Sequence, residues 1–166
     1  LSGRNFGNKD LLKDLEKWFG EYKANPESLI FEVTETAAVE NLAQARDFIE
    51  SLRALGCKFA LDDFGVGFST LHYLKHLPVD YIKIDGSFVR KLHVEPRDRI
   101  FIKAICDIAD GLGIYTIAEF VENETIDKIL GDLGVDLGQG FYYGKPLASL
   151  GPHIQDEIEN NLSTGS

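Results

Sequence analysis

The chain has 166 residues, of which 44% are hydrophobic and 27% charged, and its formal net charge at pH 7 is −10. This length and composition predict a single globular domain with a sizeable core. The acidic balance argues against an extended DNA- or RNA-binding face, which is normally basic. No apolar run approaches the roughly 20 residues that a membrane helix needs, and the N-terminus lacks a basic-then-apolar signal segment. We therefore expect a cytoplasmic domain with no membrane segment in this chain.

Predicted helices and strands alternate along the chain, with no linker or low-complexity tract between them. The predicted helices span 9–22, 39–54, 69–76, 97–112 and 123–132, and a last helix starts at about 147. The predicted strands span 29–34, 57–62, 80–84, 114–118 and 135–138. Because strands separated by helices pair in parallel through right-handed crossovers, the expected fold class is α/β.

Local signals accompany several of these segments. Asn8 is a predicted N-cap of the first helix. Gly56 is a plausible left-handed cap after the second helix. The apolar stripe of the helix at 97–112 is expected at Ile100, Ile105, Ile108 and Leu112.

Two adjacent carboxylates, Asp62 and Asp63, follow the apolar residues 59–61 and precede a glycine-punctuated stretch. They stand at the C-terminal end of a predicted buried strand, where parallel α/β folds hold their functional groups. Carboxylate oxygens on a rigid element suit hard divalent cations such as Mg²⁺. An Asp before a turn also often binds local backbone, so the pair alone leaves both interpretations open.

Charged side chains recur at the ends of other predicted strands, which favours the metal interpretation. These residues are Glu32, Lys83, Asp85, Glu119 and Asp136. The pattern is typical of a barrel that gathers its functional groups on one face. A carboxylate cluster of this kind repels phosphate until divalent ions fill it, after which it becomes a phosphate site.

Other candidate residues carry less weight. Cys57 and Cys106 have neither metal-ligand nor redox spacing and are expected to be reduced and buried. His72 and His76 lie four residues apart, which fits a solvated helix face better than a zinc site. The aromatic run at 141–143 can be read either as a stacking surface for guanine or as ordinary packing.

Five segments together resemble a known family, the EAL-domain phosphodiesterases that hydrolyse the bacterial second messenger cyclic di-GMP. The segments are FEVTE (31–35), DDFGVGFSTL (62–71), VDYIKID (79–85), AEFVE (118–122) and QGFYYGKP (139–146). Their order and spacing match the family, and the resemblance covers nearly the whole chain. It implies a (β/α)8 TIM-barrel-like fold and a two-metal site for Mg²⁺ or Mn²⁺.

The resemblance also implies roles for individual residues. The implied metal ligands are Glu32, Asp62, Asp63 and Glu119, and Glu119 is also counted as catalytic. Lys83 matches the lysine that orients or helps activate the attacking water. With two ions bound, such a site polarises the scissile phosphate and activates water at neutral pH.

Three further residues match supporting positions of the family. Glu35 matches a glutamate that steadies the loop after the aspartate pair and links metal binding to dimerisation. Asp85 and Gln139 match residues beside the lysine in the site. The expected partners are therefore cyclic di-GMP, a second copy of the chain or another form of self-association, and sensory or cyclase domains upstream.

The chain also departs from the family pattern. The Glu-Ala-Leu segment is absent and five of eight strands are predicted, so we expect residues 1–166 to be the C-terminal two-thirds of one EAL domain, with impaired activity. The strands at 29–34 and 135–138 are then expected to be open edges. Val66, Phe68 and Phe120 stand where Thr, Tyr and Gly are common. The alternative function is a catalytically inactive cyclic di-GMP receptor.

Overall fold

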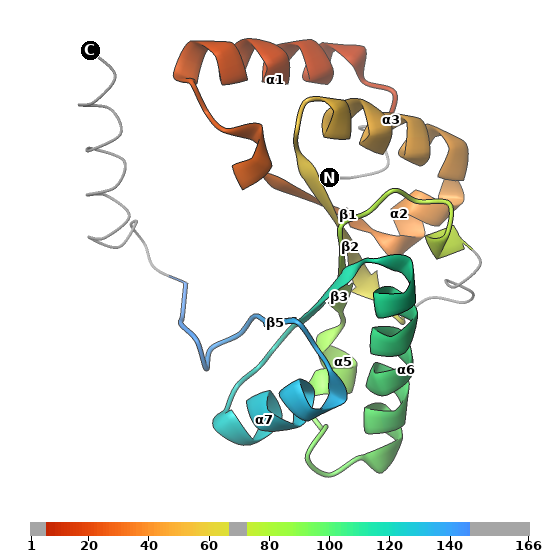
Figure 1. Ribbon diagram of the computed structural model, residues 1–166, viewed down its shortest axis with the longest axis vertical. Helices are drawn as coiled ribbons and strands as arrows, with labels where there is room; N and C mark the ends of the chain where they lie inside the picture. Colours follow the sequence, from red (N-terminus) through yellow and green to blue (C-terminus); the bar gives the residue numbers. More distant parts are fainter. Residues whose placement is uncertain (1–5, 67–72, 147–166) are drawn as a thin grey trace.

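The computed structural model describes residues 6–66 and 73–146, which form one parallel sheet flanked by helices (Figure 1). The strands are β1 (Ile30–Thr34), β2 (Lys58–Phe64), β3 (Tyr81–Ile84), β4 (Tyr115–Ala118) and β5 (Leu137–Gly138). They lie in the order β1-β2-β3-β4-β5, and every neighbouring pair is parallel. The predicted α/β class and the five predicted strands are confirmed.

The helices connect consecutive strands. They are α1 (Lys9–Tyr22), the 3-10 turn η2 (Pro26–Ser28), α2 (Glu35–Glu40), α3 (Leu42–Ala54), α5 (Gly86–Val89), α6 (Pro96–Leu112) and α7 (Glu124–Leu133). Figure 1 shows α1 to α3 at one end of the molecule and α5 to α7 at the other, with the sheet between them. Asn8 caps α1 as predicted, because its side chain accepts hydrogen bonds from the amides of Asp10 and Leu11.

Two predicted helical features are wrong in detail. The segment predicted as one helix at 39–54 is two helices, because Thr34 caps a turn that starts at Glu35 and the backbone breaks at Asn41. On α6, Ile100 is 72% exposed and Leu112 is also exposed. The buried stripe is Ile102, Ile105, Cys106 and Ala109. This stripe has regular helical spacing, and the sheet selected it over the apolar residues chosen from the sequence.

Other differences concern segment bounds. β2 extends two residues beyond the predicted strand, and the short helix α5 was not predicted at all. The predicted helix at 69–76 lies partly outside the described residues, and the predicted helix from 147 lies wholly outside them. None of the described helices is long and apolar enough to cross a membrane.

The core lies on both faces of the two inner strands β2 and β3. Phe59 and Leu61 of β2 and Ile82 and Ile84 of β3 are fully buried. Helix α3 adds Phe48, Ile49 and Leu52 to the same core. The two cysteines are free and buried, as expected from their spacing.

The edges of the sheet are much more exposed than its centre. Ile30 of β1 is 47% exposed and Leu137 of β5 is 50% exposed. These two strands have a partner on one side only within the described sheet, as expected for open edges.

Candidate functional site

The site is built on the carboxyl ends of neighbouring strands. Glu32 lies in β1, Asp62 and Asp63 in β2, Lys83 in β3, and Glu119 directly after β4. Parallel pairing in register brings these strand ends to one edge of the sheet. Residues up to 87 positions apart in the sequence therefore meet at one place.

Lys83 is the centre of this cluster. Its side chain is buried, with the residue only 4% exposed. The Nζ atom lies 2.9 Å from Glu32 Oε1, 2.9 Å from Asp62 Oδ1 and 2.8 Å from Glu119 Oε1. One ammonium thus faces three carboxylates, and the cluster keeps an excess of negative charge.

The pKa of Lys83 reflects two opposing causes. Burial disfavours the charged ammonium and by itself lowers the pKa. The hydrogen bonds to Glu119, Glu32 and Asp62 outweigh burial and raise the pKa above its ordinary value. Lys83 is therefore a cation at neutral pH and is not a general base.

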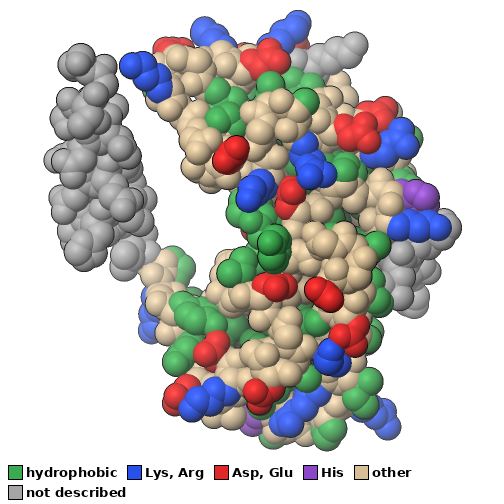
Figure 2. Space-filling view, viewed as in Figure 1, with side chains coloured by type: hydrophobic (Ala, Val, Ile, Leu, Met, Phe, Trp, Pro, Cys, Tyr) green, Lys and Arg blue, Asp and Glu red, His purple; other side chains and the backbone are tan. Residues whose placement is uncertain are grey.

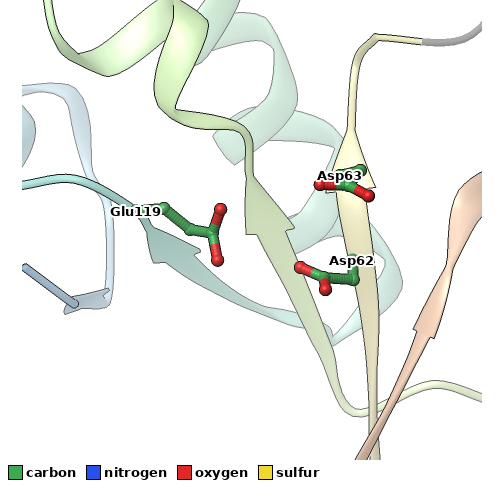
Figure 3. Close-up of side chains that lie close together, drawn as sticks. All are labelled: Asp62, Asp63 and Glu119. Carbon is green, nitrogen blue, oxygen red and sulfur yellow. The ribbon is translucent and has the colours of Figure 1, made fainter. Parts of the chain in front are cut away.

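Three carboxylates of the cluster are close enough to share a cation. One oxygen from each of Asp62, Asp63 and Glu119 lies within 4.8 Å of the others. Figure 3 shows the two aspartates stacked along the end of β2 and Glu119 reaching toward them from the end of β4. Glu32 is not part of this trio and joins the cluster through Lys83.

Adjacent strand residues normally point to opposite faces of a sheet, yet Asp62 and Asp63 both contribute to the trio. The β2–β3 register shifts between Leu61 and Phe64. Asp63 also has a left-handed backbone, with φ of 57°. This irregularity turns both carboxylates to the same side, and such distortions are often found at functional sites.

The donor set fits a hard divalent cation. Asp62 Oδ1 is buried and receives no well-aligned hydrogen bond from the described residues, although Lys83 Nζ lies 2.9 Å away in an ion pair. We give more weight to the ion pair as a contact, but it leaves acceptor capacity on this oxygen unused. Partial burial, followed by the charges of Asp62 and Asp85, raises the pKa of Asp63 against the opposing effect of Lys83. Crowded carboxylate oxygens of this kind are typical ligands of Mg²⁺ or Mn²⁺.

Glu35 and Asp85 hold the loops around the cluster. Glu35 is buried at the start of α2, and its Oε2 accepts a hydrogen bond of 3.2 Å from the amide of Gly65. It thus holds the turn that follows the aspartate pair. Asp85 caps α5, accepting a hydrogen bond of 2.8 Å from the amide of Ser87.

Gln139 lies beside Glu119 through the backbone. Its N–H donates to Ala118 O at 2.8 Å, and its carbonyl accepts from the amide of Val121 at 3.0 Å. A cavity of about 400 Å³ opens next to these residues. It is lined by Arg90, Glu119, Phe120, Glu122, Gln139, Gly140 and Phe141.

Arg90 is a site residue that the sequence interpretation missed. Its guanidinium carbon lies 3.9 Å from the centre of the Phe120 ring. Arg90 follows the short helix α5, which has no strong apolar period, so no sequence signal placed it near the strand ends. On the face shown in Figure 2, acidic and basic side chains are interspersed, which agrees with the argument against an extended nucleic-acid surface.

Comparison with known proteins agrees with this geometry. The EAL domain family matches residues 1–146. The cyclic di-GMP phosphodiesterase PdeB of Shewanella oneidensis is 41% identical over 146 residues, which are 88% of this chain and 17% of PdeB. Two solved structures are also similar. The PaMucR phosphodiesterase in complex with c-di-GMP has a TM-score of 0.82 and 34% identity, covering 89% of this chain and 60% of the other.

The FimX EAL domain from Pseudomonas aeruginosa bound to c-di-GMP has a TM-score of 0.84 and 30% identity, covering 91% of this chain and 62% of the other. The chain thus spans less than two-thirds of each of these relatives. Sequence, fold and the carboxylate cluster at the strand ends all agree, and the chain belongs to the EAL domain family.

Proposed function

We propose that the protein containing this chain hydrolyses one phosphodiester bond of cyclic di-GMP and releases a linear dinucleotide. The observation that carries this proposal is the cluster of Glu32, Asp62, Asp63 and Glu119 around the buried Lys83. It is supported by the similarity to PdeB, which is a cyclic di-GMP phosphodiesterase, and to two structures that contain c-di-GMP.

In this proposal the four carboxylates hold two Mg²⁺ or Mn²⁺ ions. When bound, the ions supply positive charge at the scissile phosphate and make water acidic enough to attack at neutral pH. Lys83 remains protonated and acts electrostatically, orienting the attacking water and stabilising negative charge in the transition state. Glu119 has two roles, because it binds both Lys83 and the candidate cation site.

Glu35, Asp85 and Gln139 then support the reacting groups. Glu35 fixes the turn at Gly65, so the aspartate pair keeps its orientation. Asp85 and Gln139 stabilise the loops after β3 and β4, on either side of Glu119. Positioning of this kind matters because small displacements of reacting groups lower the rate strongly.

We also propose that residues 1–166 are the C-terminal two-thirds of a single EAL domain with a TIM-barrel-like fold. Two observations support this extent. The chain covers about 60% of the solved relatives, and the edge strands β1 and β5 expose Ile30 and Leu137. On its own, the chain is then impaired in hydrolysis and associates through its open edges.

The proposed partners are a second copy of the domain and sensory or cyclase domains upstream, all in the cytoplasm where a bacterial second messenger acts. The loop after the aspartates supports a homodimer. Gly65 lies against Phe88 and Phe101, whose rings stack at 4.5 Å, and the neighbouring Ile100 is largely exposed. Glu35 therefore connects the carboxylate cluster to an apolar surface that a second copy could cover.

A second candidate function is a cyclic di-GMP receptor without catalysis. The observation that favours it is Phe120, a large side chain directly after Glu119 that lines the adjacent cavity. Such a ring is compatible with ligand binding but narrows the space next to a cluster residue.

One experiment separates the two functions. The full-length protein is incubated with cyclic di-GMP and Mg²⁺ or Mn²⁺, and the linear dinucleotide is separated by chromatography. Turnover is the expected result, with little or none from the 166-residue chain. Metal-supported binding without product establishes the receptor instead, whereas neither binding nor product contradicts both proposals. Light scattering on the 166-residue chain tests the edges, since a stable monomer contradicts the proposed association.

A further inference from the structure

Phe120 has an unusual backbone next to a cluster residue. Among the described residues, only three other than glycine have positive φ, and Phe120 is one of them with φ of 54°. This left-handed conformation is unfavourable for a residue with a side chain, so its surroundings must stabilise it. The reason for a ring at this position therefore lies in what the ring contacts.

The Phe120 ring is wedged between Gly86 and Arg90. A Cβ atom at Gly86 would lie 2.1 Å from the Phe120 ring, so only glycine allows the ring to lie there undisturbed. The guanidinium of Arg90 covers the ring at 3.9 Å from its centre, a favourable cation–π contact. The ring thus links the turn after β4 to helix α5, which starts directly after Asp85.

The backbone on both sides of Phe120 is fixed. The amide of Glu119 donates to Ile84 O at 3.2 Å, and the amide of Val121 donates to Gln139 O at 3.0 Å. Between these two hydrogen bonds, the conformation at position 120 sets the direction in which Glu119 leaves the strand. The Glu119 carboxylate then reaches Lys83 at 2.8 Å and approaches the aspartate pair.

We propose that Phe120 is a positioning residue, whose ring, held between Gly86 and Arg90, keeps the Glu119 carboxylate on Lys83 and within the candidate cation site. Insofar as the cation is concerned, this inference rests on the proposed function. The competing explanation is that the ring only covers apolar surface, in which case it affects stability but not the cluster.

The first measurement follows the Glu119–Lys83 ion pair without metal. The ¹⁵N signal of the Lys83 ammonium is recorded by NMR for the 166-residue chain and for Phe120→Gly, Phe120→Tyr and Glu119→Gln. Phe120→Gly is expected to shift the signal in the same direction as Glu119→Gln, and Phe120→Tyr to leave it unchanged. A Phe120→Gly protein that is folded by circular dichroism and retains the original signal overturns the inference. If Phe120→Gly does not fold, Phe120→Leu is read by the same criterion.

The second measurement uses Mn²⁺ as the probe in isothermal titration calorimetry. Phe120→Gly is expected to weaken Mn²⁺ binding about tenfold, the usual range for groups that orient a ligand, while Phe120→Tyr binds as the original chain does. Gly86→Ala is expected to weaken binding similarly, because the new methyl group displaces the ring. The double variant Gly86→Ala/Phe120→Gly is expected to be no weaker than Phe120→Gly alone, and additive losses overturn the proposed wedge.

The two measurements separate this inference from the proposed function. If the original chain binds no Mn²⁺ but the Lys83 signal responds to Phe120→Gly as expected, the cation site of this chain is contradicted while the positioning of Glu119 stands. If Mn²⁺ binds equally well to the original chain and to folded Phe120→Gly, the cation site stands and the positioning role is overturned.

Discussion

The two ends of the parallel sheet use acidic residues in opposite ways. At the amino end, Asp80 accepts a hydrogen bond of 2.9 Å from the amide of Phe59 and a second of 3.2 Å from Arg53. Asp136 likewise accepts from the amide and the hydroxyl of Thr116, at 2.8 and 2.7 Å. Each carboxylate there has donors of its own and ties one strand to its neighbour.

At the carboxyl end, by contrast, three carboxylates share the single cation of Lys83. Asp63 has other carboxylates nearby, and their charge adds to partial burial in raising its pKa. Crowding of like charges is unfavourable and persists where a ligand or a reaction uses it. The comparison indicates that donor supply, and not acidity as such, separates structural from functional carboxylates in this sheet.

The largest expected effect separates Asp62 from Asp136 in the full-length protein. Asp62→Asn removes a charged candidate ligand, so turnover of cyclic di-GMP is expected to fall by more than about 100-fold. Asp136→Asn, at the other end, is expected to leave turnover close to the original value at a temperature where the protein is folded. Chromatographic product assays measure both. Equal losses in the two variants contradict the comparison.

The next effect concerns stability at the carboxyl end. Lys83→Met leaves the carboxylates without their cation, and we expect the free energy of unfolding to fall by about 2–3 kcal/mol. This is less than for a fully buried pair, because Glu32 is about half exposed. Urea unfolding measures the loss. Added Mg²⁺ is expected to restore more stability to Lys83→Met than to the Asp136→Asn control, since a bound cation stabilises the folded state.

A smaller effect is expected at the amino end. Thr116→Val removes the hydroxyl that donates to Asp136 and that also accepts from the Asp136 amide at 3.1 Å. The free energy of unfolding is expected to fall by about 1–2 kcal/mol. Mn²⁺ affinity, measured by calorimetry, is expected to be unchanged. A clear loss of Mn²⁺ binding would show that the two ends of the sheet are coupled.

The smallest effect concerns a carboxylate at neither end. Tyr143 donates its hydroxyl hydrogen to Asp127, and this hydrogen bond, with burial and the Asp127 charge, raises the pKa of Tyr143 to about 12. The protonated phenol therefore stabilises the fold fully below about pH 10, and this contribution is lost as the pH rises toward 12. Tyr143→Phe is expected to remove that alkaline dependence from a spectroscopic unfolding series. An unchanged dependence shows that the exposed pair contributes nothing measurable.

Much of the fold followed from local sequence. Asn8 caps α1 because a side-chain oxygen next to free amide groups needs only neighbouring residues. The alternation of strands and helices also predicted a parallel sheet, and hence that Glu32, Lys83 and Glu119 lie on one edge. Bounds failed where a tertiary contact decides, as at Ile100, which is apolar but faces outward.

The sequence by itself determined the secondary-structure order, the acidic strand ends and the membership of the EAL domain family, because these depend on residue type and spacing along the chain. Only the tertiary structure decided how the groups meet. The register shift in β2 turns Asp62 and Asp63 to the same side, and the wedge of Phe120 over Gly86 depends on how two loops pack. Contacts between distant segments depend on pairing and packing across the whole sheet, and local sequence patterns do not encode them.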